Sequence, residues 1–383
     1  MSVWDSLTAS RTAAGLAAQM GSGEVPHAWL LLGPRGSGKR PVALAMAASL
    51  NCTDEPGVGC GTCSTCSRIL RARHPDVHHI QPEGPLIPVA VIRESVIPEA
   101  ALSPFEGKRK LFIIEEAERM NAAAQNALLK TLEEPNPDTV FILISDREEE
   151  LLDTVRSRCR VVRMELLSHD DLVGTLILEG AHPEAAELAA RVSGGDLDQA
   201  RALASDAAAR DLRAVWLRIP GRLTSPVDSL DVAGEVLAQV KQLVKAHEQI
   251  QKAEVIELAE AMGEGRGTAT ARNALLTRHK RELRRVEEET LGEALATIAS
   301  FYRDVLALRA GGEEAVLNTD LMDELHSWAS SDVPSALLVR AVERALETRT
   351  ALGTTNTNPL LALEAALVTL GRIAPARADA VGR

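Results

Sequence analysis

Aromatic residues are scarce in this sequence: Phe, Trp and Tyr together make up only 2% of its 383 residues. Alanine and leucine must therefore supply most of the core packing, and both residue types favour helices. Because 45% of the residues are hydrophobic, the chain can still form a sizeable core. Its length is typical of about two or three domains. We therefore expect a multidomain protein with a high helix content.

Long apolar runs are absent as well. No stretch of 18 or more consecutive apolar residues occurs, so no membrane-spanning segment is predicted. The first ten residues, MSVWDSLTAS, contain neither the basic segment nor the apolar segment of a signal peptide. We expect a cytoplasmic protein with no membrane partner.

The sequence also lacks an excess of positive charge, since its formal net charge is −12. This balance argues against a surface that binds nucleic acid throughout, because phosphate contacts need clustered Lys and Arg. One basic run, RHKRELRRVEEE at 278–289, is followed at once by acidic residues. We interpret it as a solvated helix face, with contact to DNA or to a neighbouring subunit as the alternative. The role of residues 278–285 is left open.

Cysteine is rare, but four of the five cysteines are clustered. Cys52, Cys60, Cys63 and Cys66 form the pattern C-x7-C-x2-C-x2-C. Four thiolates at short spacing suit a tetrahedral metal ion, and a full set of protein ligands leaves no open coordination position. A structural Zn²⁺ ion that holds an insertion at 52–66 is predicted. An iron–sulfur cluster, disulfides and free thiols are the alternatives.

Four apolar runs predict strands in the first 166 residues. AWLLL precedes a glycine-rich loop, and the others are KLFIIEE at 110–116, TVFILIS at 139–145 and RVVRMEL at 160–166. Helical patterns separate these runs, and such alternation predicts a parallel sheet with helices on both faces. Beyond residue 167 the strand pattern disappears. About two or three short helices are expected in 168–205 and about five or six more in 209–375.

A phosphate-loop pattern follows the first predicted strand. The pattern is G-x-x-x-x-G-K-[ST], and its backbone N–H groups cradle phosphates at a helix N-terminus. The loop consists of Gly33, Pro34, Arg35, Gly36, Ser37, Gly38, Lys39 and Arg40. Arg40 stands where a hydroxyl should bind Mg²⁺, so metal binding and hydrolysis should be weakened. Whether a nucleotide is held without hydrolysis stays open.

Two further segments carry candidate residues. Glu115 and Glu116 end the strand at 110–116, where a working NTPase places an Asp near Mg²⁺ and then a Glu that activates water. Here Glu115 takes the Asp position, and the alternative is a pair of solvated acids at a strand end. Ser157, Arg158 and Cys159 precede the last strand. By spacing alone, Arg158 would be an ordinary surface charge.

Together these segments resemble the AAA+ subunits of the bacterial DNA polymerase III clamp loader. The resemblance rests on GPRGSGK, the cysteine pattern, NALLKTLEEP at 126–135 and SRC at 157–159. It implies an α/β AAA+ core at 1–166 with a zinc-binding insertion, a helical lid at 167–207 and an all-helical collar, or oligomerisation domain, at 208–383. FYRDVLALR and NTNPLLALEAAL, near the C-terminus, are similar to the collar of the non-motor branch.

This family contains γ/τ motor subunits, which hydrolyse ATP, and the non-motor δ′ type. Arg40 and Glu115 depart from the motor pattern. In the lid, Asp198 stands where motors place an Arg, with Arg201 one turn further as an alternative. The non-motor branch is therefore the closer resemblance. A motor subunit and a zinc-dependent nucleic-acid-binding module remain the rival hypotheses.

The resemblance to the non-motor branch implies a role for Arg158. With Ser157 and Cys159, it would act as an arginine finger, in trans, on ATP held by an adjacent motor. The chain itself would hydrolyse little or no ATP, as a non-catalytic part of a DNA polymerase assembly. Its implied partners are γ/τ and δ subunits in a hetero-pentameric ring and, through that complex, the sliding clamp and primer–template DNA at the replisome.

Overall fold

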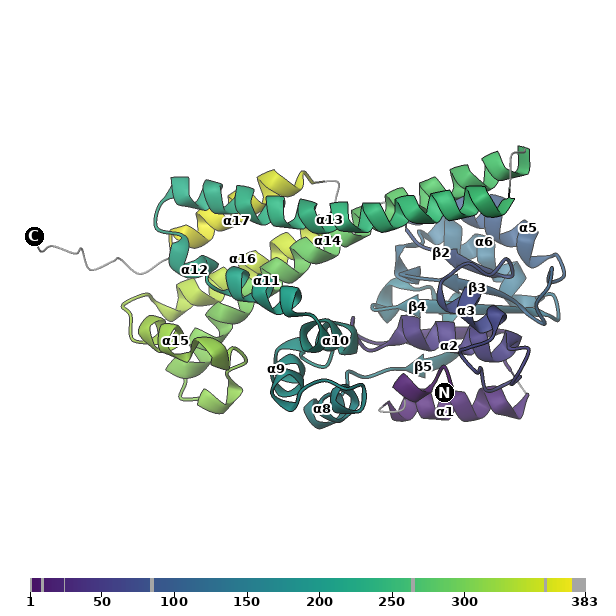
Figure 1. Ribbon diagram of the computed structural model, residues 1–383, viewed down its shortest axis with the longest axis horizontal. Coiled ribbons are helices and arrows are strands. Elements are labelled where there is room, and N and C mark those ends of the chain that lie inside the picture. Colours follow the sequence, from purple (N-terminus) through teal and green to yellow (C-terminus); the bar gives the residue numbers. More distant parts are fainter. Residues whose placement is uncertain are drawn as a thin grey trace, which may run out of the picture. The chain divides into compact units, whose positions relative to one another are not determined.

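The computed structural model describes residues 2–7, 10–23, 25–82, 86–262, 266–354 and 357–373 (Figure 1). The chain divides into two compact units, Met1–Ala207 and Ala208–Arg383. In the described parts of the chain, no helix combines the length and the apolar composition that crossing a membrane requires.

The N-terminal unit is built on a five-stranded parallel sheet with the order β2-β3-β4-β1-β5. The strands are β1 (Ala28–Leu32), β2 (Val77–Ile80), β3 (Lys110–Ile114), β4 (Thr139–Ser145) and β5 (Arg160–Arg163). Strand β2 was not predicted, because VHHI is short and carries two histidines. Strands β3 and β5 end earlier than predicted, at 114 and 163 rather than 116 and 166. As a result, Glu115 and Glu116 follow β3 instead of ending it.

Helices cover both faces of this sheet, because the side chains of each strand point alternately to the two faces. On β1, Trp29 and Leu31 pack in one core with α1 and α2, whereas Leu30 and Leu32 pack in the other with α6. The longer helices are α1 (Arg11–Ser22), α2 (Lys39–Asn51), α3 (Ser64–Leu70) and α6 (Ala122–Glu133). The shorter ones include α4 (Val89–Val91), a π-helical turn (Ile92–Val96), α5 (Ile97–Ala100) and α7 (Asp153–Arg156). The predicted α/β fold with a phosphate loop is confirmed.

Three short helices complete the N-terminal unit. They are α8 (His169–Leu178), α9 (Pro183–Ser193) and α10 (Leu197–Ser205), which pack on one another. The three match the predicted lid helices. The division of the whole chain into core, lid and collar at 166 and 207 stays a prediction.

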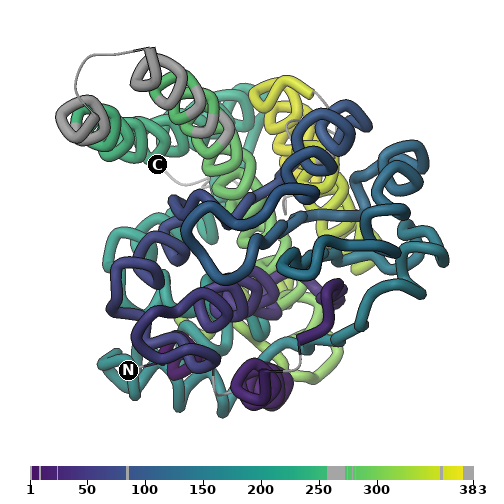
Figure 2. Tube along the Cα trace, turned by 90° about the vertical axis from the view of Figure 1, so that its right-hand side faces the viewer, coloured from purple at the N-terminus to yellow at the C-terminus, as the bar shows by residue number. Residues whose placement is uncertain are grey.

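The C-terminal unit is helical, and no strand occurs among its described residues. Its helices are α11 (Ala207–Leu217), α12 (Ile219–Arg222), α13 (Pro226–Met262), α14 (Arg266–Arg309), α15 (Met322–Ala329), α16 (Ser335–Thr354) and α17 (Pro359–Gly371). Short helices α12 and α15 raise the number above the predicted five or six. Figure 2 shows α13 and α14 running side by side. Residues 263–265, between α13 and α14, lie outside the described residues.

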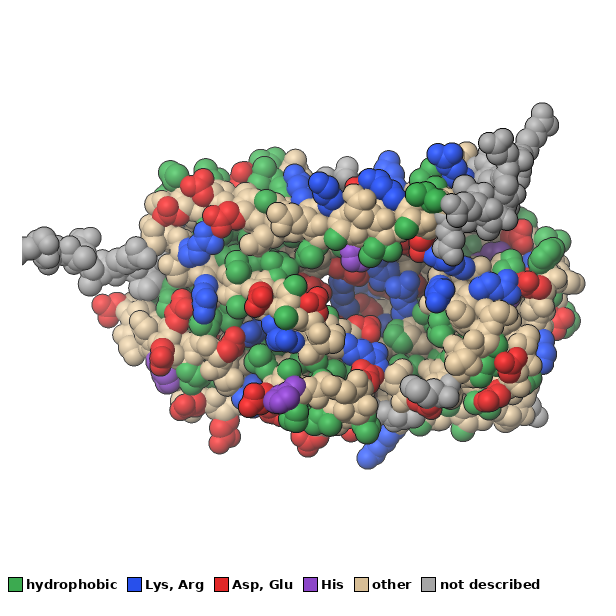
Figure 3. All heavy atoms as spheres, in the orientation of Figure 1, with side chains coloured by type: hydrophobic (Ala, Val, Ile, Leu, Met, Phe, Trp, Pro, Cys, Tyr) green, Lys and Arg blue, Asp and Glu red, His purple; other side chains and the backbone are tan. Residues whose placement is uncertain are grey.

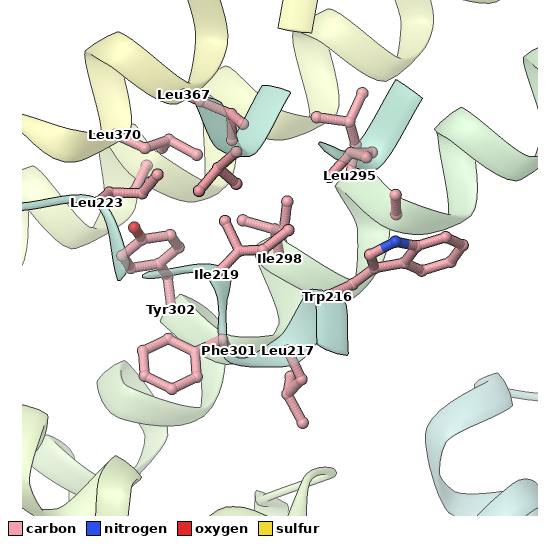
Figure 4. Close-up of a cluster of buried hydrophobic side chains, with 14 of the residues drawn as sticks. Trp216, Leu217, Ile219, Leu223, Leu295, Ile298, Phe301, Tyr302, Leu367 and Leu370 are labelled. Atoms are coloured by element: carbon pink, nitrogen blue, oxygen red, sulfur yellow. The ribbon is translucent and has the colours of Figure 1, made fainter. Parts of the chain in front are cut away.

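The core of this unit uses several of the scarce aromatic residues. Phe301, Tyr302 and Trp328 meet edge to face, with ring centroids 5.3–5.8 Å apart. Around them pack aliphatic side chains from α12, α14 and α17, among them Ile298 and Leu367 (Figure 4). Edge-to-face packing is a preferred arrangement of aromatic rings. A few large rings therefore organise a core made mostly of alanine and aliphatic residues.

Candidate functional site

The phosphate loop connects the carboxyl end of β1, a strand flanked by β4 and β5, to α2. Two glycines are needed for its close approaches to other segments. A Cβ atom at Gly33 would lie 2.1 Å from the Met164 carbonyl oxygen, and one at Gly36 would lie 2.5 Å from the Asp196 side chain. Gly36 also has a φ of +83°, which side chains rarely adopt. The glycine pattern thus reflects both contacts and backbone conformation.

Lys39 is turned into its own loop. Its Nζ donates hydrogen bonds to the carbonyl oxygens of Gly33 at 2.7 Å and Pro34 at 2.6 Å. The same atom forms an ion pair with Asp146 Oδ1 at 2.8 Å, just after β4, and the side chain is only 6% exposed. The lysine that would reach the terminal phosphates therefore already has carbonyl and carboxylate partners within the chain.

Arg40 lies against the carboxylate that a metal would otherwise approach. Its Nε is 3.0 Å from Glu115 Oε1, and Gln81 Nε2 donates to the same oxygen at 2.8 Å. The side chain of Glu115 is 5% exposed, so it is not a solvated acid at a strand end. An ion pair thus joins the two positions that Mg²⁺ bridges in a working phosphate loop, where a hydroxyl and an acid hold the ion.

The next acid is also paired. Glu116 Oε2 lies 2.7 Å from Arg119 Nε, in the segment that connects β3 to α6. Nearby, burial raises the pKa of the Glu118 carboxyl, which favours its neutral form. The acids at the end of β3 are therefore either paired with a cation or buried. None of the three is arranged as an open metal ligand.

The lid brings a carboxylate, not an arginine, to the loop. Asp198 is exposed, and Arg201 donates to Glu179 Oε2 at 3.0 Å and to the Ser6 carbonyl at 3.0 Å. Asp196, at the start of α10, is the lid residue that lies beside Gly36. Its Oδ1 also accepts a hydrogen bond from the Gln199 N–H at 3.0 Å. A negative side chain beside the loop disfavours a bound phosphate.

The four clustered cysteines come together as predicted. Their sulfur atoms all lie within 4.8 Å of one another. Cys52 Sγ is 3.7 Å from Cys60 Sγ and 3.9 Å from Cys63 Sγ. A tetrahedron with Zn–S bonds of about 2.3 Å has sulfur–sulfur separations of about 3.8 Å. The set therefore fits a single zinc ion, and the disulfide alternative is wrong because all five cysteines are free.

Backbone N–H groups in this segment point at the sulfur atoms. Cys60 N donates to Cys52 Sγ, Cys63 N to Cys60 Sγ and Cys66 N to Cys63 Sγ, at 3.3–3.4 Å. The Cys63 N–H is the main cause that lowers the pKa of Cys60. For Cys63, burial opposes ionisation, but several hydrogen bonds outweigh it and lower the pKa to about 6. Such donors stabilise the thiolate form that binds metal.

The SRC segment holds an arginine near the amino ends of the strands, on the opposite side of the sheet from the phosphate loop. Cys159 packs in the core beneath α6, and burial raises the pKa of its thiol to about 12, so it is an apolar anchor. Arg158 projects from the turn before β5. Its Nε donates to Glu133 Oε1 at 2.8 Å and its Nη1 to the Thr154 carbonyl at 2.8 Å. Ser157 Oγ donates to that carbonyl at 3.2 Å.

The strand directions separate Arg158 from the chain's own loop. Gly33, Glu115 and Asp146 follow the carboxyl ends of parallel strands, which share one edge of the sheet. Arg158 precedes the amino end of β5. At that end Arg160 of β5 lies beside Trp29 of β1 in the strand register. Trp29 is four residues before Gly33, so about 13 Å of strand separates this end from the phosphate loop. The structure therefore does not bring Arg158 to the phosphate loop of its own chain.

The basic run at 278–289 lies in α14. Arg284 pairs with Glu288 and Arg285 with Glu289 at 2.9–3.0 Å, as expected for a solvated helix face. The side chains of Arg278 and Arg281 lie outside the described residues. On the face drawn in Figure 3, positive and negative side chains are interspersed on each unit.

Sequence comparison finds similar proteins for the region that contains the phosphate loop, the four clustered cysteines and Arg158. Residues 8–168 match the family described as "DNA polymerase III, delta subunit". The chain resembles the DNA polymerase III delta prime subunits. Subunit delta prime of Bacillus subtilis (strain 168) is 38% identical over 167 residues, which are 44% of this chain and 50% of that protein. Its Pseudomonas aeruginosa counterpart is 43% identical over 145 residues, 36% of this chain and 43% of that protein.

The matched region covers about half the length of these delta prime relatives or less. Among solved structures, a DNA polymerase III gamma subunit-related protein from Thermotoga maritima aligns with a TM-score of 0.44 and 18% identity. That alignment covers 94% of this chain and 99% of the other.

Sequence reasoning missed the partners of the predicted residues. They are Gln81, Arg119, Glu133, Asp146 and Asp196. One signal was available, since Asp146 directly follows a buried strand and must lie at the same edge as Glu115 in a parallel sheet. The others are ordinary polar residues on helices or in turns, with no pattern that marks them.

Proposed function

We propose that this chain is the non-motor, delta prime type of subunit in a DNA polymerase III clamp loader, and that it supplies Arg158 to the ATP site of an adjacent motor subunit. One observation carries the proposal. The phosphate loop has its charges paired within the chain, while Arg158 lies at the opposite edge of the sheet, 31% exposed. An arginine placed there serves a neighbour more readily than its own chain.

In this role Arg158 would contact the γ-phosphate of ATP bound to the motor. The planar guanidinium presents paired N–H donors that match phosphate oxygens. Charge builds on these oxygens as the phosphoryl group is transferred, and an arginine supplied in trans raises the rate by about 10³–10⁵. Cys159 fixes the turn through its buried thiol, and the Ser157 hydroxyl closes the turn on Thr154.

The chain's own loop would act as a scaffold with little or no hydrolysis. ATP or ADP could occupy it only by displacing Lys39 from its carbonyl partners and from Asp146. Arg40 puts a positive charge where Mg²⁺ would bind, and no hydroxyl is available at that position to ligate the ion. Like charges at this distance disfavour metal binding.

The remaining assignments follow from the same proposal. Zn²⁺, held by the four clustered cysteines, would keep the insertion at 52–66 folded and supply no chemistry. The helical unit at 208–383 would join γ/τ and δ subunits in a hetero-pentameric ring. Through that ring the chain would help to place the sliding clamp on primer–template DNA, in the cytoplasm at the replisome.

A reconstituted ring tests the proposal. Arg158→Ala should lower ATP hydrolysis at the adjacent motor site by about 10³-fold or more. Arg163→Ala is a matched control, because Arg163 is an exposed arginine in β5, the strand that follows Arg158, and pairs only with Glu148 among the described residues. Unchanged hydrolysis with Arg158→Ala would refute the trans role. ATP hydrolysis by the isolated chain, abolished by Lys39→Ala, would favour a motor subunit instead.

A further inference from the structure

The guanidinium of Arg158 is held by one carboxylate. Glu133, the last residue of α6, accepts hydrogen bonds at Oε1 from both Nε and Nη2 of Arg158, with an Nε–Oε1 distance of 2.8 Å. The Glu133 side chain is 46% exposed and that of Arg158 is 31% exposed. Among the described residues, no other carboxylate pairs with this arginine. Glu133 therefore determines where the guanidinium points.

The contacts leave part of the guanidinium available. An arginine carries five N–H donors in a fixed planar fork. Glu133 takes two of them, at Nε and Nη2, and the Thr154 carbonyl takes a third, at Nη1. A long contact of 3.5 Å joins Nη1 to Ser157 Oγ. The second N–H of Nη2 has no partner among the described residues, and the second N–H of Nη1 has only this long contact. A phosphate that approaches the exposed side could therefore accept from both terminal nitrogens.

We propose that Glu133 is a positioning residue for Arg158. It holds the side chain extended across the turn, so that the terminal N–H groups are oriented before a neighbouring ATP site meets them. This inference rests on the proposed trans role of Arg158. Glu133 itself touches no substrate, and its carboxylate lies on the Nε side of the guanidinium.

The expected effect lies in turnover, not in folding. An ion pair between partly exposed side chains adds little to stability. A flexible arginine must instead be ordered at the moment of reaction, and small errors in placement reduce rates strongly. Glu133→Gln retains one hydrogen-bond acceptor but removes the charge, so the guanidinium should sample other orientations. The turnover number should fall while the KM for ATP, set by the motor's own loop, stays constant.

The chain supplies a matched control beside Glu133. Glu134 follows directly at the end of α6, is exposed, and pairs with no cation among the described residues. Replacing it with Gln makes the same change of charge and size one position away. A general effect of removing a negative charge from this edge would appear in both variants.

The experiment measures kcat and KM for ATP in the reconstituted ring. Glu133→Gln should lower kcat about 3- to 30-fold with KM unchanged, and Glu134→Gln should stay within about twofold of the parent. In an Arg158→Ala background, Glu133→Gln should cause no further loss, because the residue it positions is gone.

Three results would overturn the inference. They are an unchanged kcat for Glu133→Gln, an equal loss for Glu134→Gln, and a full further loss in the Arg158→Ala background. A failure of the proposed trans role would give a different result, because the Arg158→Ala ring would then hydrolyse ATP at the parental rate.

Discussion

The parallel sheet has charged side chains both at the carboxyl ends of its strands, here called the carboxyl edge, and at their amino ends, the amino edge. The charged groups at these two edges are similar in kind but differ in their surroundings. At the carboxyl edge, Lys39, Arg40 and Arg119 are each paired with a carboxylate of the same chain around the phosphate loop. At the amino edge, Arg158 has a carboxylate partner too, and it is 31% exposed against 47% for Arg40. Where a charged side chain lies on the sheet therefore distinguishes the two edges better than whether that side chain is paired.

Removal of the metal should have the largest effect, because it should destabilise the N-terminal unit, to which both edges and the cysteine cluster belong. Metal analysis should find about one Zn²⁺ per chain. Cys63→Ser should destabilise the N-terminal unit by more than about 3 kcal/mol, since structural zinc contributes its binding energy to folding. Thermal unfolding with and without chelator measures this. A metal-free chain with unchanged stability would contradict the site.

At the amino edge, a substitution of Asp76 should affect the stability of the fold without affecting the role of Arg158. Asp76 accepts backbone N–H bonds from Phe105, Glu106 and Gly107 at 2.6–2.9 Å. Burial opposes ionisation, but these bonds together hold the pKa of Asp76 below its usual value. Asp76→Asn should cost about 1–3 kcal/mol of stability while leaving ATP hydrolysis in the ring unchanged.

The pH dependence of Asp76 has a definite sign. The pKa is lower in the folded chain than in the unfolded chain, so the carboxylate stabilises the fold above the unfolded value. That contribution should be lost as pH falls below about 4, through the folded pKa. Urea unfolding at several pH values should show this acid-dependent loss in the parent and a smaller one in Asp76→Asn. Equal pH slopes for the two proteins would contradict the assignment.

Two substitutions at the carboxyl edge should restore part of the Mg²⁺-dependent binding of ATP. Arg40→Thr combined with Glu115→Asp restores the hydroxyl and the shorter acid that hold Mg²⁺ in working phosphate loops. We expect the affinity for ATP to rise about tenfold or more in the presence of Mg²⁺, or about 1.4 kcal/mol. Calorimetric titration with and without Mg²⁺ measures it, with Arg40→Lys as the control that keeps the positive charge. Equal affinities for the double variant and the control would show that features other than Arg40 and Glu115 prevent ATP from binding to the phosphate loop.

Much of the N-terminal unit could be predicted from local patterns. AWLLL followed by GPRGSGK specifies a buried strand, a loop and a helix within about 20 residues, and the four cysteines are close in sequence. Strand β2 escaped prediction because a four-residue edge strand with two histidines carries almost no periodic signal. The fold class is thus set by short-range features that sequence displays directly.

The partners at both edges depend on long-range folding, and single-sequence patterns do not contain that information. Lys39 and Asp146 are separated by more than a hundred residues, and Glu133 and Arg158 by 25. Their meeting requires the sheet order, which places β4 beside β1. The sequence could therefore predict which residues carry charge at each edge, but not which of them are already paired.

The central claim is that the arginine works for a neighbour and the loop does not work for its own chain. Single-turnover ATP hydrolysis at the adjacent motor site, measured in rings that contain Lys39→Ala or Arg158→Ala, tests it directly. The account predicts a rate within about twofold of the parent for Lys39→Ala and a loss of about 10³-fold for Arg158→Ala. A large loss with Lys39→Ala, together with parental hydrolysis in Arg158→Ala rings, would contradict it.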